Sequence, residues 1–183
     1  MPSNIEIKAH LRNRAAVEET VRRLSDRGPD IILQEDIFFR CEGARLKLRI
    51  LGPDRGELIR YERADRAEVR RSDYRIAHTK DPEVLRNILS DTLGSVGVVK
   101  KTRTLYLIGQ TRVHLDQVEG LGDYLELEVV LRRGQSDAEG QAIAKALLSQ
   151  FGVGEGELIA EAYVDLLARK QAQEPEEMPV GNN

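Results

Sequence analysis

The sequence contains a single cysteine, Cys41, and no long apolar run. With one thiol, the chain cannot form an internal disulfide, and it lacks the paired cysteines typical of a zinc site. No stretch approaches the ~20 apolar residues that span a bilayer, and the start of the chain has no signal-peptide profile. These absences predict a cytoplasmic protein in a reducing compartment, with no membrane partner.

Motifs of several enzyme classes are also missing. The sequence has no GxxxxGK[ST] loop, which excludes a P-loop nucleotidase, and its three histidines and one cysteine lack the setting of a nucleophilic triad. Its 28 basic and 31 acidic residues give a formal net charge of -3. This balance argues against a general nucleic-acid binder, unless the basic residues cluster locally.

The length and the composition predict one domain. A chain of 183 residues with 40% hydrophobic content can bury one good core, which we place in residues 1–170. The last stretch, QAQEPEEMPVGNN, has two prolines and no periodic apolar residues. Residues 171–183 are therefore predicted to be a disordered tail.

Alternation of apolar and polar residues predicts about eight strands, near residues 4–11, 32–40, 44–51, 57–63, 68–78, 99–108, 111–118 and 124–132. Short links such as Gly109-Gln110 indicate antiparallel neighbours. Four helices are predicted: one capped by Asn13 and ended by Gly28, one opened by Asp81-Pro82, one with a capping box at Ser136 to Glu139, and one from about Leu158 to Lys170. This order of elements favours an α+β fold.

Each predicted strand has one apolar face and one charged face. In the first strand Ile5 and Ile7 share one face, while Glu6 and Lys8 share the other. A two-residue hairpin at 109–110 would place Arg103 directly across from Asp116. The helices need apolar partners, so they should cover the apolar face from outside and leave the charged face to line the lumen of a closed eight-stranded antiparallel barrel. An open twisted sheet with its charges in water is the alternative.

The charges on the predicted inner face are segregated by sign. Basic pairs at alternate positions, Lys47 with Arg49 and Lys101 with Arg103, suit the phosphate oxygens of a polyanion. The acidic candidates are Glu6, Asp116, Glu126 and Glu128. These carboxylates would repel the same ligand unless a hard divalent cation lay between them, which implies Mg²⁺ or Mn²⁺. Such a set is the usual equipment for phosphoryl transfer.

Six segments, taken together and in order, resemble the CYTH superfamily, also called triphosphate tunnel metalloenzymes. They are NIEIK at the N-terminus, RLKLR at 45–49, ELIRYER at 57–63, VKKTRTLY at 99–106, RVHLDQVEGLG at 112–122 and YLELE at 124–128. The stretch HLDQVEGLGDYLELE is most similar to the branch of class IV adenylyl cyclases. The resemblance implies an eight-stranded closed tunnel, a divalent metal and a triphosphate lying along the bore.

Matching positions assigns roles to individual residues. The resemblance implies metal ligation by Glu6, Asp116, Glu126 and Glu128, and substrate binding by Lys8, Lys47, Arg49, Arg63, Lys101 and Arg103. Arg112 and His114 share the face of Asp116 and are secondary candidates for substrate binding. Glu6, Lys8, Arg103 and Asp116 are the predicted catalytic residues. Arg63 is favoured over Arg60, which has the opposite parity in the same strand. Asn4 replaces the first acid of the family signature ExExK, so a second metal should bind more weakly.

The resulting functional hypothesis is a metal-dependent enzyme that acts on a triphosphate, most similar to a class IV adenylyl cyclase that converts ATP to cyclic AMP and pyrophosphate. One alternative is a triphosphatase that hydrolyses inorganic, thiamine or nucleoside triphosphate. The other is a non-catalytic binder of triphosphate or polyphosphate, with metal occupancy impaired by Asn4. A homodimer is expected from general base rates alone.

Overall fold

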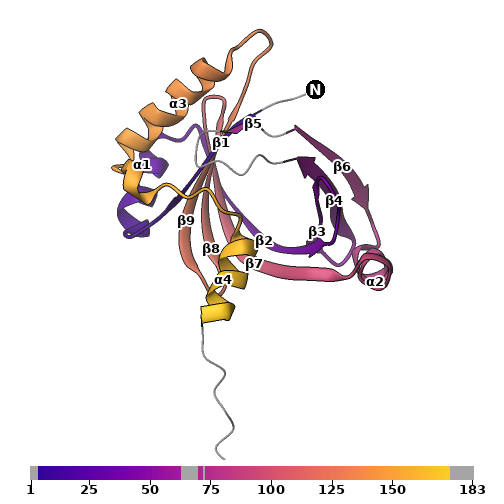
Figure 1. Cartoon of the computed structure of the whole chain (residues 1–183). Helices are drawn as coiled ribbons and strands as arrows, with labels where there is room; N and C mark the ends of the chain where they lie inside the picture. Colours follow the sequence, from indigo (N-terminus) through magenta and orange to yellow (C-terminus); the bar gives the residue numbers. More distant parts are fainter. Residues whose placement is uncertain (1–3, 63–69, 72, 174–183) are drawn as a thin grey trace, which may run out of the picture.

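The computed structural model describes residues 4–62, 70–71 and 73–173 of the chain. Within these residues, one antiparallel sheet curls into a half-barrel (Figure 1), with the strand order β5-β1-β9-β8-β7-β2-β3-β4-β6. The strands are β1 (Asn4–His10), β2 (Arg27–Phe39), β3 (Arg45–Gly52), β4 (Arg55–Glu62), β5 (Arg70–Arg71), β6 (Asp73–Thr79), β7 (Ser95–Ile108), β8 (Thr111–Val118) and β9 (Gly122–Val130). The predicted strand at 68–78 is present as two pieces, β5 and β6. The α+β class and the antiparallel sheet are confirmed, whereas closure of the barrel stays a prediction.

The hairpin at Gly109-Gln110 sets the register of the central strands. Gly109 has a φ of 55°, a conformation that glycine adopts without steric cost. Ile108 pairs with Thr111, and the ladder continues to the pair Arg103 and Asp116. The predicted register is therefore confirmed.

Two helices cover the outer face of one half of the sheet, α1 (Arg14–Leu24) and α3 (Asp137–Gln150). They bury the apolar sides of β1, β8 and β9, including Ile7, Leu115 and Leu127. The predicted caps are present: the Asn13 side chain accepts from the Ala16 amide, and Ser136 forms a capping box with Glu139. This is the largest apolar core among the described residues.

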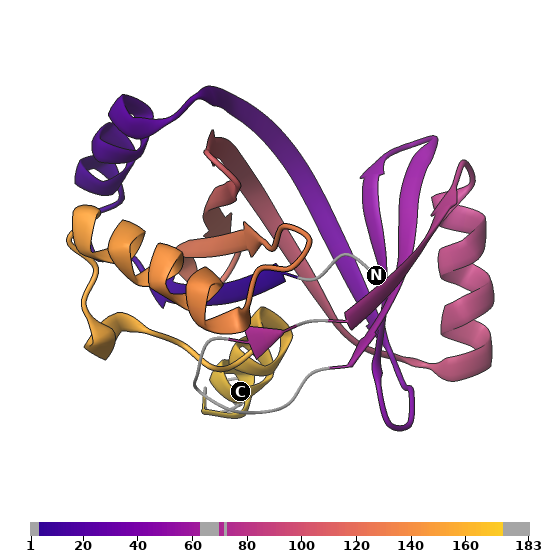
Figure 2. The same cartoon turned by 90° about the horizontal axis from the view of Figure 1, so that it is seen from above.

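The helix α2 (Pro82–Leu93) covers the outer face of the other half. Its Leu85 and Leu89 pack against Ile37 and Leu48 of β2 and β3. Figure 2 shows α2 on the opposite side of the molecule from α1 and α3. The charged face of the sheet is left on the concave side, as the strand parity predicts.

The fourth helix, α4 (Tyr163–Gln173), does not follow the prediction that helices pack on the outside. Ala162, just before the helix, and Tyr163, Val164 and Leu166 in its first turn form a cluster with Phe38, Val99, Val118 and Tyr124. These strand residues lie on the concave face, because Val99 is two positions from Lys101 and Val118 is two positions from Asp116. The concave face becomes apolar near one end of the strands, and α4 packs there.

Two helix ends also differ from those predicted from the sequence. Helix α1 ends at Leu24 rather than at Gly28, because residues from Arg27 onward pair with the long strand β7. The predicted last helix begins only at Tyr163, since Leu158 forms a bridge with Ala9 and is extended.

Of the predicted tail, residues 171–173 continue α4, and the rest lies outside the described residues. No helix in the described part of the chain is long and apolar enough to cross a membrane.

Candidate active site

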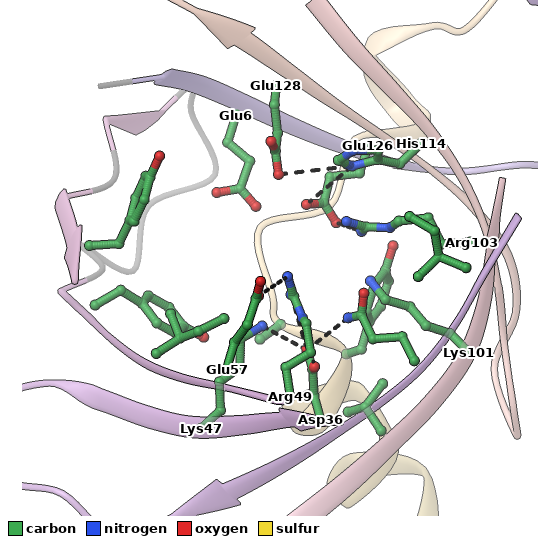
Figure 3. A pocket seen from close by; sticks show the side chains of 18 of the residues that line it. Glu6, Asp36, Lys47, Arg49, Glu57, Lys101, Arg103, His114, Glu126 and Glu128 are labelled. Atoms are coloured by element: carbon green, nitrogen blue, oxygen red, sulfur yellow. Dashed lines mark hydrogen bonds and ion pairs between the residues drawn. The ribbon is translucent and has the colours of Figure 1, made fainter. Parts of the chain in front are cut away.

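A cavity of about 360 Å³ lies on the concave face of the sheet (Figure 3). The predicted site residues that line it are Glu6, Lys8, Lys47, Arg49, Lys101, Arg103, Arg112, His114, Glu126 and Glu128. They come from β1, β3, β7, β8 and β9, so the curl of the sheet brings together residues that are far apart in the sequence. Convergence of these charged side chains around one cavity is the main expectation of the sequence analysis.

One predicted residue, Asp116, is not among those that line this cavity. Asp116 is fully buried behind its wall, with 0% of the residue exposed. Arg63 lies outside the described residues. In β4, Glu57, Ile59 and Tyr61 line the cavity, whereas Arg60, which has the opposite parity, is exposed.

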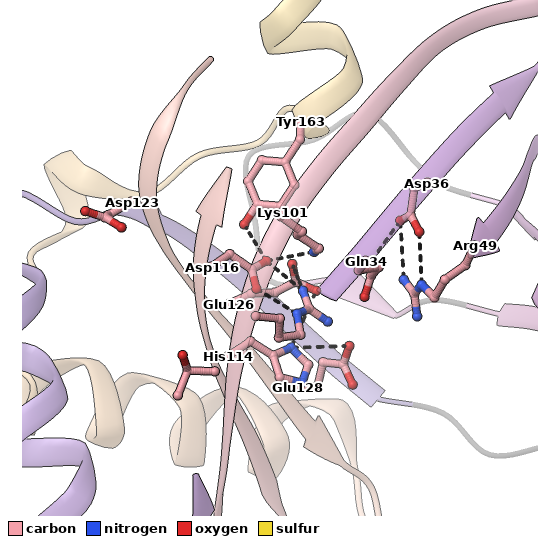
Figure 4. Close-up of polar contacts among 12 residues, drawn as sticks. Gln34, Asp36, Arg49, Lys101, His114, Asp116, Asp123, Glu126, Glu128 and Tyr163 are labelled. Atoms are coloured by element: carbon pink, nitrogen blue, oxygen red, sulfur yellow. Dashed lines mark hydrogen bonds and ion pairs between the residues drawn. The ribbon is translucent and has the colours of Figure 1, made fainter. Parts of the chain in front are cut away.

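Asp116 holds the first basic pair. Its two carboxylate oxygens accept hydrogen bonds from Lys101 Nζ at 2.7 Å, from Arg103 Nε and Nη2 at 2.7 Å each, and from the Tyr163 hydroxyl at 3.1 Å (Figure 4). Burial alone would raise the Asp116 pKa, but Arg103 and Lys101 outweigh it and hold the pKa well below its usual value. The carboxylate is therefore ionised and fixes both cations at the cavity wall.

Asp36 holds the second basic pair in the same way, and sequence reasoning missed it. Its carboxylate accepts from Lys47 Nζ at 2.7 Å, Arg49 Nε at 3.0 Å and Gln34 Nε2 at 3.1 Å. It lies directly across from Arg49, as Asp116 lies across from Arg103. A hairpin at Glu42-Gly43 would have indicated this pairing. Burial lowers the pKa of Lys47 to about 8, despite the opposing effect of Asp36.

The carboxylates gather on the neighbouring strands β1 and β9. Glu6 pairs across the strands with Glu128, and Lys8 with Glu126. Arg103 Nη2 donates to Glu126 Oε2 at 3.1 Å, and Arg112 Nη1 donates to Glu128 Oε2 at 3.2 Å. Burial would raise the Glu126 pKa, but Arg103, Lys101 and Lys8 outweigh it and keep the group ionised.

His114 lies beside these two glutamates. Its Nδ1 is 4.0 Å from Glu126 Oε1 and 3.9 Å from Glu128 Oε1. Burial, with a further contribution from Arg103, lowers the pKa of His114 to about 4. The imidazole is therefore neutral at physiological pH.

The donor set fits a divalent metal. Two acidic side chains, Glu6 and Glu128, lie directly opposite each other in the sheet, and both line the cavity. Within the described residues, Asn4 Oδ1 and His114 Nδ1 are buried polar atoms with no hydrogen-bond partner. Carboxylate and amide oxygens are ligands that Mg²⁺ and Mn²⁺ prefer, and imidazole is a common additional ligand for transition metals.

Another part of the cavity wall is apolar and aromatic, a feature that the sequence analysis did not single out. Tyr61 and Tyr74 face each other across β4 and β6, next to the pair Ile59 and Ile76, and all four line the cavity. Lys47 Nζ lies 5.7 Å from the centre of the Tyr61 ring. The cavity therefore has an ionic part and an apolar part.

The segment that leads into α4 completes the wall. Lys8 Nζ donates to the Glu161 carbonyl oxygen at 3.3 Å and lies 4.0 Å from the centre of the Tyr163 ring. Lys101 Nζ lies 4.9 Å from the same ring. Burial and the nearby Asp116 raise the Tyr163 pKa well above its usual value, so its hydroxyl keeps its proton.

Comparison with known proteins agrees with this architecture. A protein from Pyrococcus horikoshii is 23% identical over 90% of this chain and 99% of its own, with a TM-score of 0.81. A proposed adenylate cyclase from Vibrio parahaemolyticus is 18% identical over 90% and 97%, with a TM-score of 0.72. A proposed adenylyl cyclase from Hippeastrum, described as having a dominant triphosphatase activity, is 16% identical over 91% and 96%, with a TM-score of 0.63.

No curated protein matches the sequence. The family model for the CYTH domain matches residues 3–163, which is most of the chain. The chain belongs to the CYTH domain family.

Proposed function

We propose that this protein is a divalent-metal-dependent phosphoryl-transfer enzyme that acts on an organic triphosphate, and that its reaction is the conversion of ATP to cyclic AMP and pyrophosphate. The proposal depends on one observation. Two Lys-x-Arg pairs on β3 and β7 and a carboxylate group on β1 and β9 line the same cavity. Phosphoryl transfer needs this combination of cations and metal-binding carboxylates more than it needs a protein nucleophile.

The basic residues would bind the phosphates. Lys47, Arg49, Lys101 and Arg103 are fixed by Asp36 and Asp116 before the substrate arrives, so little side-chain entropy is lost on binding. Guanidinium and ammonium groups donate to phosphate oxygens that carry growing charge in the transition state. Lys8 and Arg112, on either side of the glutamates, are the remaining described cations of the proposed substrate set.

Glu6, Glu126 and Glu128 would hold the metal. When bound, a divalent cation would neutralise charge on the transferring and leaving phosphate oxygens. Asp116 was assigned to the same role from the sequence, and it could coordinate metal only by exchanging one of its present hydrogen-bond donors. We therefore propose for Asp116 a positioning role towards Lys101 and Arg103.

The apolar part of the cavity favours an organic triphosphate over inorganic triphosphate. Tyr61 and Tyr74 offer aromatic rings, beside Ile59 and Ile76, on which a nucleobase could stack. In cyclisation the ribose 3′ oxygen attacks the α-phosphorus and pyrophosphate leaves. A base held at the apolar part of the cavity would lie next to the basic pair on β3, since β3 is the strand beside β4.

A triphosphatase is the second candidate, because the same residues would serve attack by water on the terminal phosphorus. The dominant activity described for the Hippeastrum protein, which shares this fold, favours it. Incubation with ATP, thiamine triphosphate and inorganic triphosphate, each with Mg²⁺ or Mn²⁺, separates the candidates by their products. Cyclic AMP with pyrophosphate supports the cyclase, and orthophosphate without cyclic AMP supports the triphosphatase. Thermal stabilisation by triphosphate with no turnover would support a non-catalytic binding module.

We further propose that the half-barrel closes into a tunnel. Its two edge strands, β5 and β6, are separated by one residue in the chain, and they pair with β1 and with β4 respectively. One segment of chain therefore pairs with both open edges of the remaining sheet. Protection of the Glu6 and Arg70 amides, which face each other between β1 and β5, from hydrogen exchange in the presence of triphosphate would support closure, and rapid exchange of both would reject it.

A further inference from the structure

His114 carries an unpartnered nitrogen at the cavity wall. The residue is 3% exposed, and within the described part of the chain its Nδ1 atom is buried with no hydrogen-bond partner. A buried polar atom without a partner costs roughly 1–3 kcal/mol. Because His114 also lines the cavity, this nitrogen can serve a ligand that enters it.

The two glutamates beside His114 each present one oxygen to this nitrogen. Oε2 of Glu126 is bound by Arg103, and Oε2 of Glu128 is bound by Arg112. The Oε1 atoms lie 4.0 Å and 3.9 Å from Nδ1, and the ligand atoms of the three residues lie within 4.8 Å of one another (Figure 4). Each arginine therefore holds a glutamate so that its second oxygen faces the same point as Nδ1.

Hydrogen bonding does not account for this arrangement. Distances of 3.9 and 4.0 Å are too long for an N–H donor, which needs about 2.7–3.2 Å. In the neutral imidazole that carries its proton on Nε2, the lone pair of Nδ1 faces two negative oxygens. This arrangement is unfavourable unless a cation lies between the nitrogen and the oxygens. Ligand atoms bonded to one small cation lie ~3 Å apart when adjacent, so the three side chains, whose ligand atoms now lie within 4.8 Å of one another, would need to close by about 1–2 Å.

We propose that Nδ1 of His114 is a metal ligand, together with Oε1 of Glu126 and Oε1 of Glu128, and that it shifts the preference of the site from Mg²⁺ towards Mn²⁺ and other transition metals. Imidazole binds transition-metal ions better than it binds Mg²⁺, which prefers oxygen ligands. The nitrogen ligand would also add to a ligand set in which Asn4 has replaced a carboxylate. This inference rests on the metal-dependent function proposed above.

Electron spin echo spectroscopy of the full-length protein with bound Mn²⁺ and no substrate tests the proposal directly. A coordinated imidazole adds ¹⁴N modulation to the Mn²⁺ signal, and ¹⁵N-histidine labelling should change that modulation. The variant His114→Gln should lose it. His78→Gln is the matched control, because the His78 imidazole also lies 3.8 Å from a glutamate oxygen, in Glu57, but its side chain is 79% exposed.

Calorimetric titration gives a second, independent measure. His114→Gln should weaken Mn²⁺ binding more than about tenfold and change Mg²⁺ binding far less, whereas His78→Gln should change neither. If His114→Gln fails to fold, the isotope comparison is made in the wild type and in His78→Gln: histidine modulation that persists in both supports the proposal, and its absence from the wild type overturns it.

The possible outcomes test the role of His114 as a metal ligand separately from the proposed function. Mn²⁺ binding without histidine modulation overturns the role of His114 and leaves the proposed function standing. Histidine modulation in a protein that turns over no triphosphate supports the ligand and refutes the function. Absence of any Mn²⁺ binding overturns the ligand and the metal-dependent function together.

Discussion

Replacing Asp116 with asparagine tests whether this residue serves to hold the cavity cations in place. The substitution keeps the size of the side chain and removes its charge. It leaves Lys101 and Arg103, both buried, facing a neutral amide in place of the carboxylate that now accepts from both of them. The amide nitrogen of asparagine is also a donor, so at least one of the present hydrogen bonds is lost.

The expected loss of unfolding free energy is large for a change that replaces one oxygen atom by a nitrogen. Removing one partner of a buried ion pair destabilises a protein by about 3–5 kcal/mol, because the other charge stays buried and uncompensated. Asparagine can still accept one hydrogen bond, so we expect the lower end, about 3 kcal/mol. In a protein of this size that corresponds to a fall in Tm of roughly 6–12 °C.

Urea unfolding followed by circular dichroism measures this loss, with Asp123→Asn as the matched control. Asp123 also accepts from an arginine, Arg14, at 3.1 Å, but its side chain is 32% exposed, so its loss should cost less than about 1 kcal/mol. Equal destabilisation by the two variants would refute the positioning role. Loss of Mn²⁺ binding in Asp116→Asn at unchanged stability would instead support direct metal ligation.

The pH dependence of stability gives a further readout of the same pair. The folded pKa of Asp116 lies below its unfolded value, so its contribution is complete above the unfolded pKa, near 4, and is lost as the pH falls through the folded pKa. Wild-type stability should therefore fall more steeply than that of Asp116→Asn as the solution is acidified below about pH 4.

Three other substitutions address the site. Glu128→Gln should abolish turnover. It should lower the free energy of unfolding by about 1 kcal/mol or less, because its partner Arg112 is half exposed. Unchanged rates would count against the metal site. Lys47 loses its proton above about pH 8, so KM for the triphosphate should rise above that pH in the wild type. In Lys47→Arg it should not rise, because arginine stays charged. Parallel pH profiles of KM in the two proteins would exclude Lys47 from phosphate binding. Asn4→Glu should tighten Mn²⁺ binding by about tenfold and raise the rate; no gain would show that the missing carboxylate is not limiting.

Most of the correct predictions followed from strand parity, the alternation of side chains between the two faces of a strand. Because side chains alternate with period two, one correct hairpin at Gly109-Gln110 placed Arg103 across from Asp116 and assigned Lys101 and His114 to the same face. The alternation is dictated by backbone geometry, so it does not depend on distant contacts. The convergence of ten predicted residues on one cavity follows from it.

The failures arose where tertiary contacts decide the structure. Asp36 was overlooked because, until the register of the Glu42-Gly43 hairpin is worked out, nothing in the residues around it shows that it lies across from Arg49. The position of α4 depends on apolar residues such as Val99 and Val118, which continue the charged face beyond its last charge. Period-two reasoning identifies a face, but it does not show where along that face the lining changes from ionic to apolar.

The two buried aspartates behind the basic pairs have a consequence for how the cavity responds to its solvent. A bare patch of lysine and arginine gathers mobile ions from solution, and a polyanion that displaces them binds with an affinity that falls steeply with added salt. Here Asp36 and Asp116 act as built-in counter-ions for Lys47, Arg49, Lys101 and Arg103. An incoming triphosphate has few dissolved ions to displace, so its affinity should depend only weakly on ionic strength.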